Sequence, residues 1–484
     1  MKGRLRPARV VLLGQMLLVG LFLQFTGRLQ PQLVPDSQHY LEFSWDSPSA
    51  VLGQIRTPGY PAFLTLAAPG GNIGFVPEAH YVAYCLSVVV FAAGLKRLGV
   101  AEWPRMWTAS ALLYANILHG YVTTIASDTL AAALAVAAAG LLFSALHRPR
   151  FLVPLGLCAT AAWLVRPAYL SLVVQLPLLG AAVLLSRRSW NPEARRIART
   201  ALVLAATTLV PLIAYCTLRS AVVGRFGVVA FGGFNVIGIA GQFLDEPMVE
   251  SLPVDVQPVA RLALTRRAAA DESDPRLMSD APVLNYQRME NRYDHTMWNI
   301  FRPAAEQIEP SDASSVNTRL RRLAQAIIRE RPMMYAVYLA KAFRRAVFKI
   351  VGDTVLNPYC LGLCLLIVGV DLFRILRPVP SAVTNDASDR VQPSSVQHRA
   401  SRGAASLHSL DSGLWTRNSP DLMTLTAFIH AACQLAVVIL VCPPLGRMTD
   451  AMALFVPALL MTIFVDRIMP PVNFRRRANE ADVH

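Results

Sequence analysis

Residues 10–42 read VVLLGQMLLVGLFLQFTGRLQPQLVPDSQHYLE. A mainly apolar run, residues 10–26, is followed at once by a polar segment that includes Asp36 and Glu42. A membrane-spanning helix needs about 17–25 predominantly apolar residues, so this run is long enough to be one. The chain repeats the alternation of apolar runs and polar turns up to residue 464. The pattern predicts an all-α protein that crosses a membrane several times.

The composition agrees with this fold class. The 484 residues are 54% hydrophobic and 16% charged, with a mean hydropathy of +0.41. Soluble domains carry about 25% charged residues. The alternative, a large soluble helical protein, would need several core helices that are apolar over about 18–20 residues, which is rare. We therefore predict a polytopic integral membrane protein.

Basic residues give the chain a formal net charge of +15, and they occur in short clusters between the apolar runs. Residues 96–97, 147–150 and 475–477 are such clusters. Nucleic-acid binding needs a single basic patch or stripe, which is absent from this sequence. Loops rich in Lys and Arg are typical of the cytoplasmic side of a membrane protein. We therefore exclude nucleic acid as a partner and expect both termini in the cytoplasm.

About ten spans are expected, and an even number agrees with two termini on one side. The first could be a cleaved signal peptide, but no small-residue cleavage site follows it, so we expect a retained helix. The expected spans are residues 10–26, 81–95, 106–118, 129–146, 151–165, 168–185, 201–218, 358–370, 422–441 and 451–464.

The polar stretches between the spans suggest how the chain is divided. Residues 220–332 hold 13 Arg, no Lys and 14 acidic residues, so they are nearly neutral, unlike the basic inner loops. Long loops cross the membrane largely regardless of charge, and this block fits a small α-rich extracytoplasmic domain. The expected segments are a transmembrane module 1–219 with its first outer loop at 27–78, the extracytoplasmic domain 220–332, an amphipathic interfacial helix 333–350, a transmembrane helix 351–377, a disordered cytoplasmic loop 378–420, and a transmembrane pair with a basic tail at 421–484.

The interfacial helix is expected from the spacing of its cations. Lys341, Arg344, Arg345 and Lys349 lie on one helical face, and apolar residues lie on another. Such a helix commonly lies in the plane of the membrane surface. The alternative is a span whose long cationic side chains reach toward its ends, but four cations in mid-span are costly.

The predicted topology brings several polar residues to the outer face. Arginine suits the recognition of phosphate, because its planar guanidinium makes two parallel hydrogen bonds. A group of acids and arginines at that face therefore suggests a site for an anionic lipid carrier. The residues are Asp36, His39, Tyr40, Glu42, Arg56, Tyr60, Asp128, Arg166 and Arg447.

Five short motifs carry a resemblance to a known family. Asp36-Ser-x-x-Tyr40, followed by Arg56-Thr-Pro-Gly-Tyr-Pro61, resembles the first outer loop of the GT-C superfamily of membrane glycosyltransferases. The similarity is to the bacterial branch of protein O-mannosyltransferases and lipid A aminoarabinose transferases. Ser127-Asp-Thr-Leu130 resembles the Ser-Glu-x-Leu element of that family, with Asp in place of Glu. Leu164-Val-Arg-Pro167 resembles its Arg-Pro turn, and Arg447-Met448 its late Arg-Tyr element.

The resemblance implies a GT-C-like fold in a bacterial inner membrane, with the active site on the extracytoplasmic side. It implies transfer of a sugar, with inversion, from a polyprenyl-phosphate donor to the hydroxyl of a lipid, polysaccharide or protein. The family's catalytic carboxylate corresponds to Asp36, which would take the acceptor's proton. A phosphate leaving group needs cationic stabilisation, for which Arg56, Arg166 and Arg447 are candidates.

Each candidate also has an ordinary structural interpretation. Asp36 and Asp128 could each cap a helix, and Asp128 could otherwise be a second carboxylate for the acceptor or for a metal. His39 and Glu42 are three residues apart and could pair with each other. The other candidates could be interface anchors or loop supports: Tyr40, Tyr60, Arg56, Arg166 and Arg447.

No metal site or other cofactor is predicted. The seven cysteines form no CxxC pair, and there is no HExxH motif. Asp36 and Asp128 could share a divalent cation bound to the donor phosphate, but two carboxylates alone are weak evidence for one.

Other functions remain open for a protein of this composition. A lipid-linked saccharide flippase or transporter would favour polar or broken residues near the middle of its spans. An O-antigen ligase or polymerase would also use a lipid-linked donor, with its key residues on a late outer loop. A purely structural membrane protein is the remaining alternative.

Overall fold

The computed structural model describes residues 7–116, 121–186, 194–273, 282–308, 313–376, 419–444 and 446–469. The loop predicted at 378–420 lies almost wholly outside the described residues, as does the basic tail after residue 469. The described residues form helices, turns and a single β-bridge. The α-helices of the first part are α1 (Pro7–Phe25), α2 (Ser37–Leu41), α3 (Pro48–Gly53), α4 (Gly59–Ala67), α5 (Val76–Arg97), α6 (Glu102–Ala111), α7 (Leu113–Asn116), α8 (Asp128–His147), α9 (Leu152–Val165), α10 (Leu172–Ser186) and α11 (Ala194–Val223).

The second part of the chain begins with a group of shorter helices and ends with four helices that return along the bundle. These helices are α12 (Gly232–Ala240), α13 (Gln257–Ser273), α14 (Tyr286–His295), the π-helical turn Thr296–Phe301, α15 (Arg302–Ile308), α16 (Ala313–Glu330), α17 (Pro332–Leu356), α18 (Pro358–Leu376), α19 (Ser419–Ile439), α20 (Gly446–Met452) and α21 (Val456–Ile468).

Among the described residues, eight helices are long and apolar enough to cross a membrane. The prediction of an all-α polytopic membrane protein is therefore confirmed, but two of the ten expected spans fall on helices that are too short to be among these eight. The span expected at 106–118 is divided into α6 and α7 at Leu112, whose carbonyl oxygen accepts a hydrogen bond from the Tyr84 hydroxyl at 2.9 Å. The span expected at 151–165 is the short apolar helix α9, which ends where Arg166 takes an extended conformation before Pro167.

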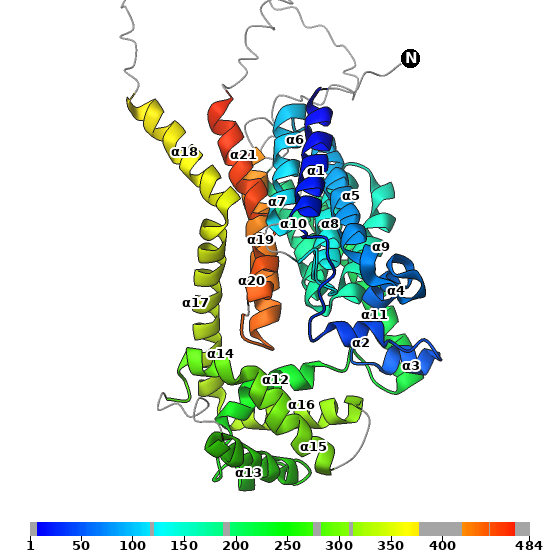
Figure 1. Cartoon of the computed structure of the whole chain (residues 1–484), viewed down its shortest axis with the longest axis vertical. Helices are drawn as coiled ribbons and strands as arrows, with labels where there is room; N and C mark the ends of the chain where they lie inside the picture. The colour runs from blue at the N-terminus through cyan, green and yellow to red at the C-terminus, as the bar shows by residue number, and fades with distance from the viewer. Residues whose placement is uncertain are drawn as a thin grey trace, which may run out of the picture.

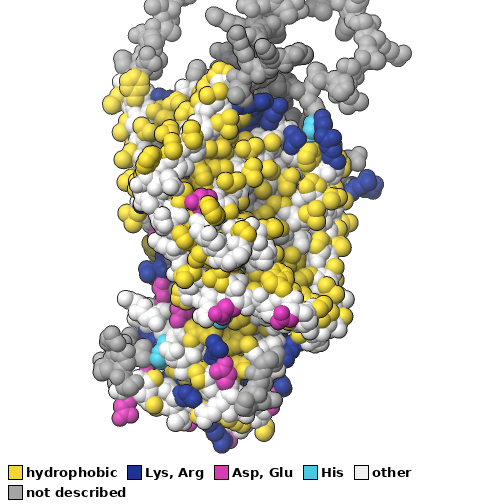
Figure 2. All heavy atoms as spheres, turned by 45° about the vertical axis from the view of Figure 1, so that its right-hand side comes forward, with side chains coloured by type: hydrophobic (Ala, Val, Ile, Leu, Met, Phe, Trp, Pro, Cys, Tyr) yellow, Lys and Arg dark blue, Asp and Glu magenta, His cyan; other side chains and the backbone are white. Residues whose placement is uncertain are grey.

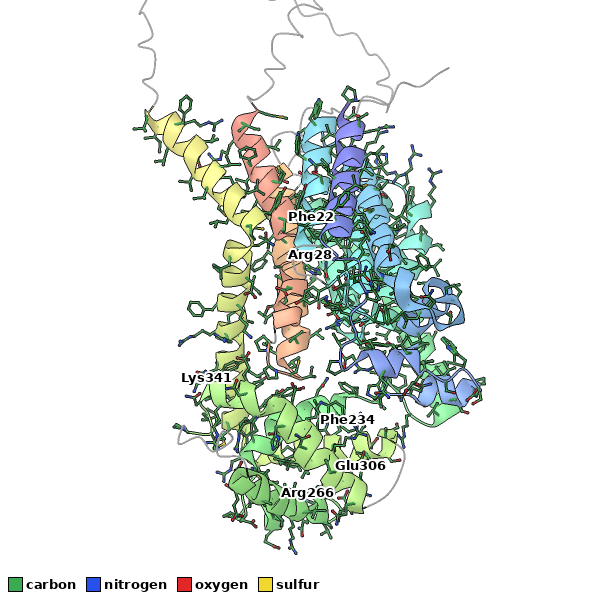
Figure 3. All side chains as sticks on the ribbon, viewed as in Figure 1. Phe22, Arg28, Phe234, Arg266, Glu306 and Lys341 are labelled. Carbon is green, nitrogen blue, oxygen red and sulfur yellow. The ribbon has the colours of Figure 1, made fainter. Side chains whose placement is uncertain are left out.

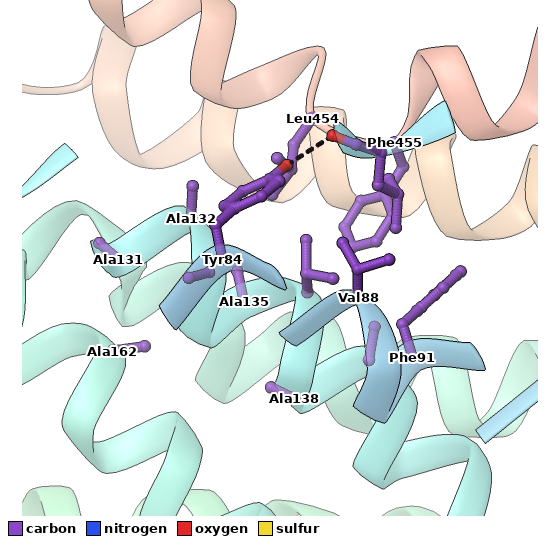
Figure 4. Packing of buried hydrophobic residues seen from close by; sticks show 14 of the residues in the cluster. Tyr84, Val88, Phe91, Ala131, Ala132, Ala135, Ala138, Ala162, Leu454 and Phe455 are labelled. Carbon is purple, nitrogen blue, oxygen red and sulfur yellow. Dashed lines mark hydrogen bonds between the residues drawn. The ribbon is translucent and has the colours of Figure 1, made fainter. Parts of the chain in front are cut away.

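The core of the bundle forms where α5 and α8 pack against each other (Figure 4). Tyr84, Val88 and Phe91 of α5 are completely buried and face the alanine-rich side of α8. Gly94 and Gly140 allow this close approach, since a Cβ atom on Gly94 would lie 2.3 Å from the Gly140 carbonyl oxygen. Small residues at such contacts are the usual means by which membrane helices pack closely.

Helices α12 to α16 form a small body at one end of the bundle, which we call the distal domain (residues 232–330). Figure 1 shows it at the end opposite the first residues of α1. It has its own apolar core, to which Phe234, Phe301 and Leu320 contribute. Tyr338 of α17 and Val438 of α19 join the same core, so the domain is packed onto the bundle rather than joined to it by a linker alone.

The structure differs from the expected interfacial helix. Helix α17 runs to Leu356 and stands upright beside α19 and α20, rather than lying across the ends of the spans (Figure 1). Its cationic face contacts the distal domain (Figure 3): Lys341 Nζ donates to the Leu284 carbonyl oxygen at 2.5 Å, and Lys349 Nζ donates to Glu290 at 2.5 Å. The contact of this cationic face with the distal domain of the same chain therefore explains part of the amphipathic pattern.

The surface of the bundle is apolar, with charged side chains concentrated beyond its ends. Figure 2 shows a broad hydrophobic band, Lys and Arg side chains at the end away from the distal domain, and charges of both signs around that domain. Such a band matches the hydrocarbon region of a bilayer. The first and last described residues both lie at the end away from the distal domain (Figure 1).

Candidate active site between the bundle and the distal domain

The first loop is fixed against the loop that precedes α8. Gln32 and Thr124 form an isolated parallel β-bridge, in which Gln32 donates to the Thr123 carbonyl oxygen at 2.8 Å. The Ser37 hydroxyl then donates to the Ile125 carbonyl oxygen at 2.8 Å. These bonds hold Asp36 next to the start of α8, although almost ninety residues separate the two loops in sequence.

Gly59 fixes the second half of the first loop. It begins α4, and its backbone lies directly against the last turn of α9. A Cβ atom at this position would lie 2.5 Å from the carbonyl carbon of Leu164, so only glycine fits without displacing the backbone. The contact brings Arg56 and Arg166 to the same side of the bundle.

Asp36 and Arg56 form an ion pair, with 2.6 Å between Arg56 Nη2 and Asp36 Oδ1. Asp36 precedes α2 in the capping position, but its side chain makes no capping hydrogen bond. The guanidinium of Arg56 lies over the rings of Tyr40, at 5.3 Å, and Phe231, at 5.1 Å. Arg56 therefore connects the first loop with the segment that leads into the distal domain.

Asp128 and Arg166 form a second ion pair, with 2.6 Å between Arg166 Nη1 and Asp128 Oδ1. Asp128 is the first residue of α8, and Ser127 occupies the capping position in its place. The Tyr40 hydroxyl lies 3.2 Å from Ser127 Oγ, which connects the first loop to this second pair. Both side chains of the pair are almost buried, with exposed fractions of 13% for Arg166 and 9% for Asp128.

A cavity of about 430 Å³ lies between these residues and the distal domain. Four residues predicted from the sequence line it, and Asp128 lies behind Arg166 through their ion pair. The wall nearer the bundle is completed by Val438, at the end of α19, and by Cys442, in the turn that follows this helix. The four predicted lining residues are Asp36, Tyr40, Arg56 and Arg166.

The other predicted residues lie elsewhere. Tyr60 is completely buried behind Tyr40, with 3.2 Å between its hydroxyl and His80 Nε2. His39 and Glu42 are exposed side chains outside the cavity lining, and Glu42 accepts a hydrogen bond from Gln38 rather than from His39. Arg447 belongs to α20, but its side chain is outside the described part of the structure.

The electrostatic environment of the site keeps several groups in defined protonation states. Burial disfavours the charged form of Arg166, but Asp128 and neighbouring groups outweigh this effect and raise its pKa above the usual value. Burial also raises the pKa of Tyr60, which therefore stays protonated. Although His39 is exposed in part, desolvation of its ring by the surrounding protein, followed by the nearby Arg56, lowers its pKa, so the imidazole is mainly neutral near pH 7.

The sequence did not point to the opposite wall of the cavity. This wall comes from the segment before α12, from α12 itself and from the helical rod of residues 286–308. The sequence did contain a relevant feature, because aromatic residues occur in this otherwise polar block. No pattern in the neighbouring sequence, however, indicates that these residues lie close to the first loop. The wall includes Phe231, Asn235, Tyr293, Asp294, Met297 and Trp298.

The residues described by the structure include no group of three or more His, Cys, Asp or Glu side chains arranged to hold a metal ion. Asp36 and Asp128 are each paired with an arginine.

Three polar side chains on α10 and α19, which we call the polar seam, lie inside the bundle. Val438 of α19 and Ala168, in the 3-10 turn Pro167–Ser171 that precedes α10, line the cavity. Further from the cavity, His430 Nδ1 lies 3.1 Å from Gln175 Oε1, and His430 Nε2 lies 2.9 Å from the Ala451 carbonyl oxygen. All three side chains of the seam that lie inside the bundle, Gln175, His430 and Gln434, are completely or almost completely buried.

No family model, curated protein or solved structure matches this chain. The part of the chain that the structure describes defines an all-α protein with eight helices able to cross a membrane, and a cavity between the helix bundle and a distal helical domain.

Proposed function

We propose that this protein is a membrane glycosyltransferase that moves a sugar from a polyprenyl-phosphate donor to an acceptor hydroxyl, with Asp36 as the general base. The observation that carries the proposal is the composition of the cavity. Two carboxylates, Asp36 and Asp294, and two guanidinium groups, Arg56 and Arg166, line the same cavity, and Asp36 lies on the side of the two arginines. The proposal includes a GT-C-like fold, with the cavity on the extracytoplasmic side of a bacterial inner membrane.

The size and lining of the cavity support a small polar reacting group on an apolar carrier. Binding pockets for small ligands usually measure about 300–1,000 Å³ and are mainly apolar, with a few convergent polar groups. This cavity of about 430 Å³ is within that range. Its apolar wall includes Val437 and Val438, at the end of the candidate membrane-spanning helix α19, and Val441 just beyond it, where the prenyl chain would lie.

The reaction would proceed by a single displacement at the anomeric carbon. The acceptor oxygen attacks that carbon while its proton passes to the Asp36 carboxylate. The bond from the anomeric carbon to the phosphate oxygen breaks, and polyprenyl phosphate leaves with the bonding electron pair. Arg56 and Arg166 stabilise the charge of that leaving group. The configuration at the anomeric carbon is inverted because the displacement occurs once.

The resting ion pair has a role in this scheme. A carboxylate held by an arginine is a weaker base, because the positive charge favours its ionised form. When the donor phosphate binds, Arg56 would turn from Asp36 to the phosphate. Without this ion pair the carboxylate would be a stronger base, so it would accept the proton more readily while a donor is present.

The test is the substitution Asp36→Asn, with Asp46→Asn as the matched control in the same loop. Asp46 is exposed and only accepts a hydrogen bond from Ser44, at 2.7 Å. General-base catalysis contributes about 10²–10⁴-fold, so we expect Asp36→Asn to reduce sugar transfer from membrane-extracted donors by that factor. Both variants should insert normally. Unchanged transfer in Asp36→Asn would reject this residue as the base.

A second function, translocation of a lipid-linked saccharide, is favoured by one observation. His430, Gln175 and Gln434 are polar residues inside membrane-spanning helices, where such residues often mark a transport path. Proteoliposomes that contain a fluorescent polyprenyl-linked saccharide would distinguish the two functions. Movement of the probe between leaflets without formation of a glycosidic bond would favour translocation, and bond formation without movement would favour transfer.

A further inference from the structure

The two walls of the cavity differ in chemistry. The wall formed by the bundle and the first loop is charged, with Asp36, Arg56 and Arg166. The wall formed by the distal domain carries an amide, Asn235, and an aromatic side chain, Trp298, beside the carboxylate of Asp294. Guanidinium groups suit a phosphate, whereas an amide and a carboxylate beside an aromatic ring suit a part of the substrates that carries no phosphate.

Tyr293 fixes the orientation of Asn235. Burial raises the pKa of Tyr293 well above its usual value, so its hydroxyl stays protonated. That hydroxyl donates to Asn235 Oδ1 at 3.2 Å. Because the amide oxygen is used in this bond, the two N–H groups of Asn235 Nδ2 are the part of the side chain available to a ligand.

The aromatic part of the wall is rigid. The ring of Trp298 stacks on Phe234, with 5.7 Å between centroids and 20° between planes, and Arg302 lies 5.3 Å from its centroid. Trp298 belongs to the π-helical turn Thr296–Phe301, a type of turn that is rare and frequently found at functional sites. The wall is therefore formed before a ligand binds.

This wall lies close to the proposed base. Arg56 contacts both sides, since its guanidinium is 2.6 Å from Asp36 and 5.1 Å from the centre of the Phe231 ring. A group bound to the distal wall would therefore be separated from the Asp36 carboxylate by about the length of one side chain. That position suits the acceptor rather than the donor phosphate.

We propose that the distal wall is the acceptor subsite and that the acceptor is a saccharide. This inference rests on the proposed transfer reaction. A sugar ring presents hydroxyl groups, which need both donors and acceptors, and C–H groups, which pack on aromatic side chains. A fatty acyl chain would need none of the polar groups. An extended peptide commonly pairs with the edge of a sheet, and the described part of the distal domain contains no strand.

The occupant can be identified by photo-crosslinking in intact cells that produce the full chain. The probe is Val229→p-benzoylphenylalanine, at a half-buried loop position in the cavity lining. The matched control is Val254→p-benzoylphenylalanine, at a loop position of the distal region that is 80% exposed. After proteolysis, mass spectrometry measures the mass added to each labelled peptide.

We expect added masses that form a monosaccharide series at position 229 and not at 254. Asn235→Leu should lower the adduct yield about three- to tenfold, the range for the loss of one hydrogen bond. Asn299→Leu, in the π-helical turn that also carries Trp298 but with an exposed side chain outside the cavity lining, should leave the yield unchanged. Peptide or acyl adducts alone at position 229, or equal labelling at both positions, would overturn the proposal.

The outcome can be separated from that of the transfer reaction. Acceptor binding does not require the base, so the saccharide adduct should persist in Asp36→Asn. A saccharide adduct together with normal transfer in Asp36→Asn would reject the proposed base and keep the subsite. Loss of transfer in Asp36→Asn without a saccharide adduct at position 229 would reject the subsite and keep the base.

Discussion

The Arg56 guanidinium lies 2.6 Å from the Asp36 carboxylate and between the rings of two residues far apart in sequence. Tyr40 comes from the first loop, and Phe231 from the segment that begins the distal domain. A single side chain therefore ties the proposed base to both sides of the cavity. Arginine suits this position because it combines a permanent charge with a flat surface that stacks on aromatic rings.

Arg56 can be tested by two substitutions that separate charge from shape. Arg56→Gln removes the charge and should lower sugar transfer about 10²–10³-fold, the usual effect of deleting one group that stabilises a developing negative charge. Arg56→Lys keeps the charge but loses the planar stack, so it should retain more activity than Arg56→Gln. Arg28→Gln is the control, because Arg28 also lies over a ring, Phe22, but outside the cavity lining. Equal activity of the wild type and Arg56→Gln would exclude a role in transfer.

The Asp128–Arg166 pair should show strong energetic coupling. Both side chains are almost buried, so removing one partner leaves an uncompensated charge, which costs about 3–5 kcal/mol. Asp128→Asn should therefore lower the unfolding free energy in detergent by about that amount. The double variant Asp128→Asn/Arg166→Gln should be less destabilised than the sum of the single variants. Additive losses would show that the two residues do not interact in solution.

Gly59 offers a test of how the first loop is positioned. A Cβ atom there would lie 2.5 Å from the Leu164 carbonyl carbon, so Gly59→Ala must shift α4 away from α9. We expect a loss of about 1–3 kcal/mol of stability, and a larger loss of transfer than of protein. Gly53→Ala is the matched control, because its nearest neighbour would be Val223 Cγ1 at 3.9 Å. Similar activities of the two variants would contradict the proposed role of the Gly59 contact.

Much of the fold could be predicted from the sequence because apolar length is a local property. The runs that became α1, α8 and α19 were read directly from their composition. The division at Leu112 could not be predicted, since the hydroxyl that bonds to its carbonyl oxygen belongs to Tyr84 on another helix. Glu290 forms ion pairs with the cationic face of α17, and this pairing could likewise not be predicted from the local sequence pattern.

The candidate site was only half predictable, for the same reason. The motifs around Asp36 and Arg166 suggested one wall, because such residues beside apolar spans suit an anionic lipid. The opposite wall depends on the packing of the distal domain against the bundle. Asn235 and Trp298 line the cavity only because of this contact between parts of the chain that are distant in sequence.

His39 should make stability depend on pH. Burial, followed by the nearby Arg56, lowers its pKa in the folded protein below the ordinary value of about 6.5. Below that pH the unfolded chain binds the proton more readily than the folded protein, so stability falls as the pH decreases. We expect a smaller loss of Tm between pH 7.5 and pH 5.5 in His39→Gln than in the wild type. An unchanged difference would show that His39 does not contribute.

The seam between α10 and α19 offers a prediction in which two neighbouring substitutions act in opposite directions. Both ring nitrogens of His430 face oxygen atoms, of Gln175 and of Ala451. The oxygen and nitrogen of the Gln175 amide exchange places when the amide group is turned over. In that orientation the Gln175 nitrogen donates to His430 Nδ1, and His430 Nε2 donates to the Ala451 carbonyl oxygen. Both hydrogen bonds then form while the imidazole ring is neutral. His430→Leu would leave the partners of these bonds buried and unpaired, which costs about 1–3 kcal/mol for each group.

Gln434 lies one helical turn further along α19, and its Nε2 atom is buried without a hydrogen-bond partner among the described residues. Gln434→Leu removes a polar group whose burial is already uncompensated, so it should leave the stability unchanged or increase it. Thermal unfolding of both variants in the same detergent measures the difference. A clear loss of stability in Gln434→Leu would mean that this amide has a partner in the membrane-embedded protein, such as an ordered water molecule or a bound substrate.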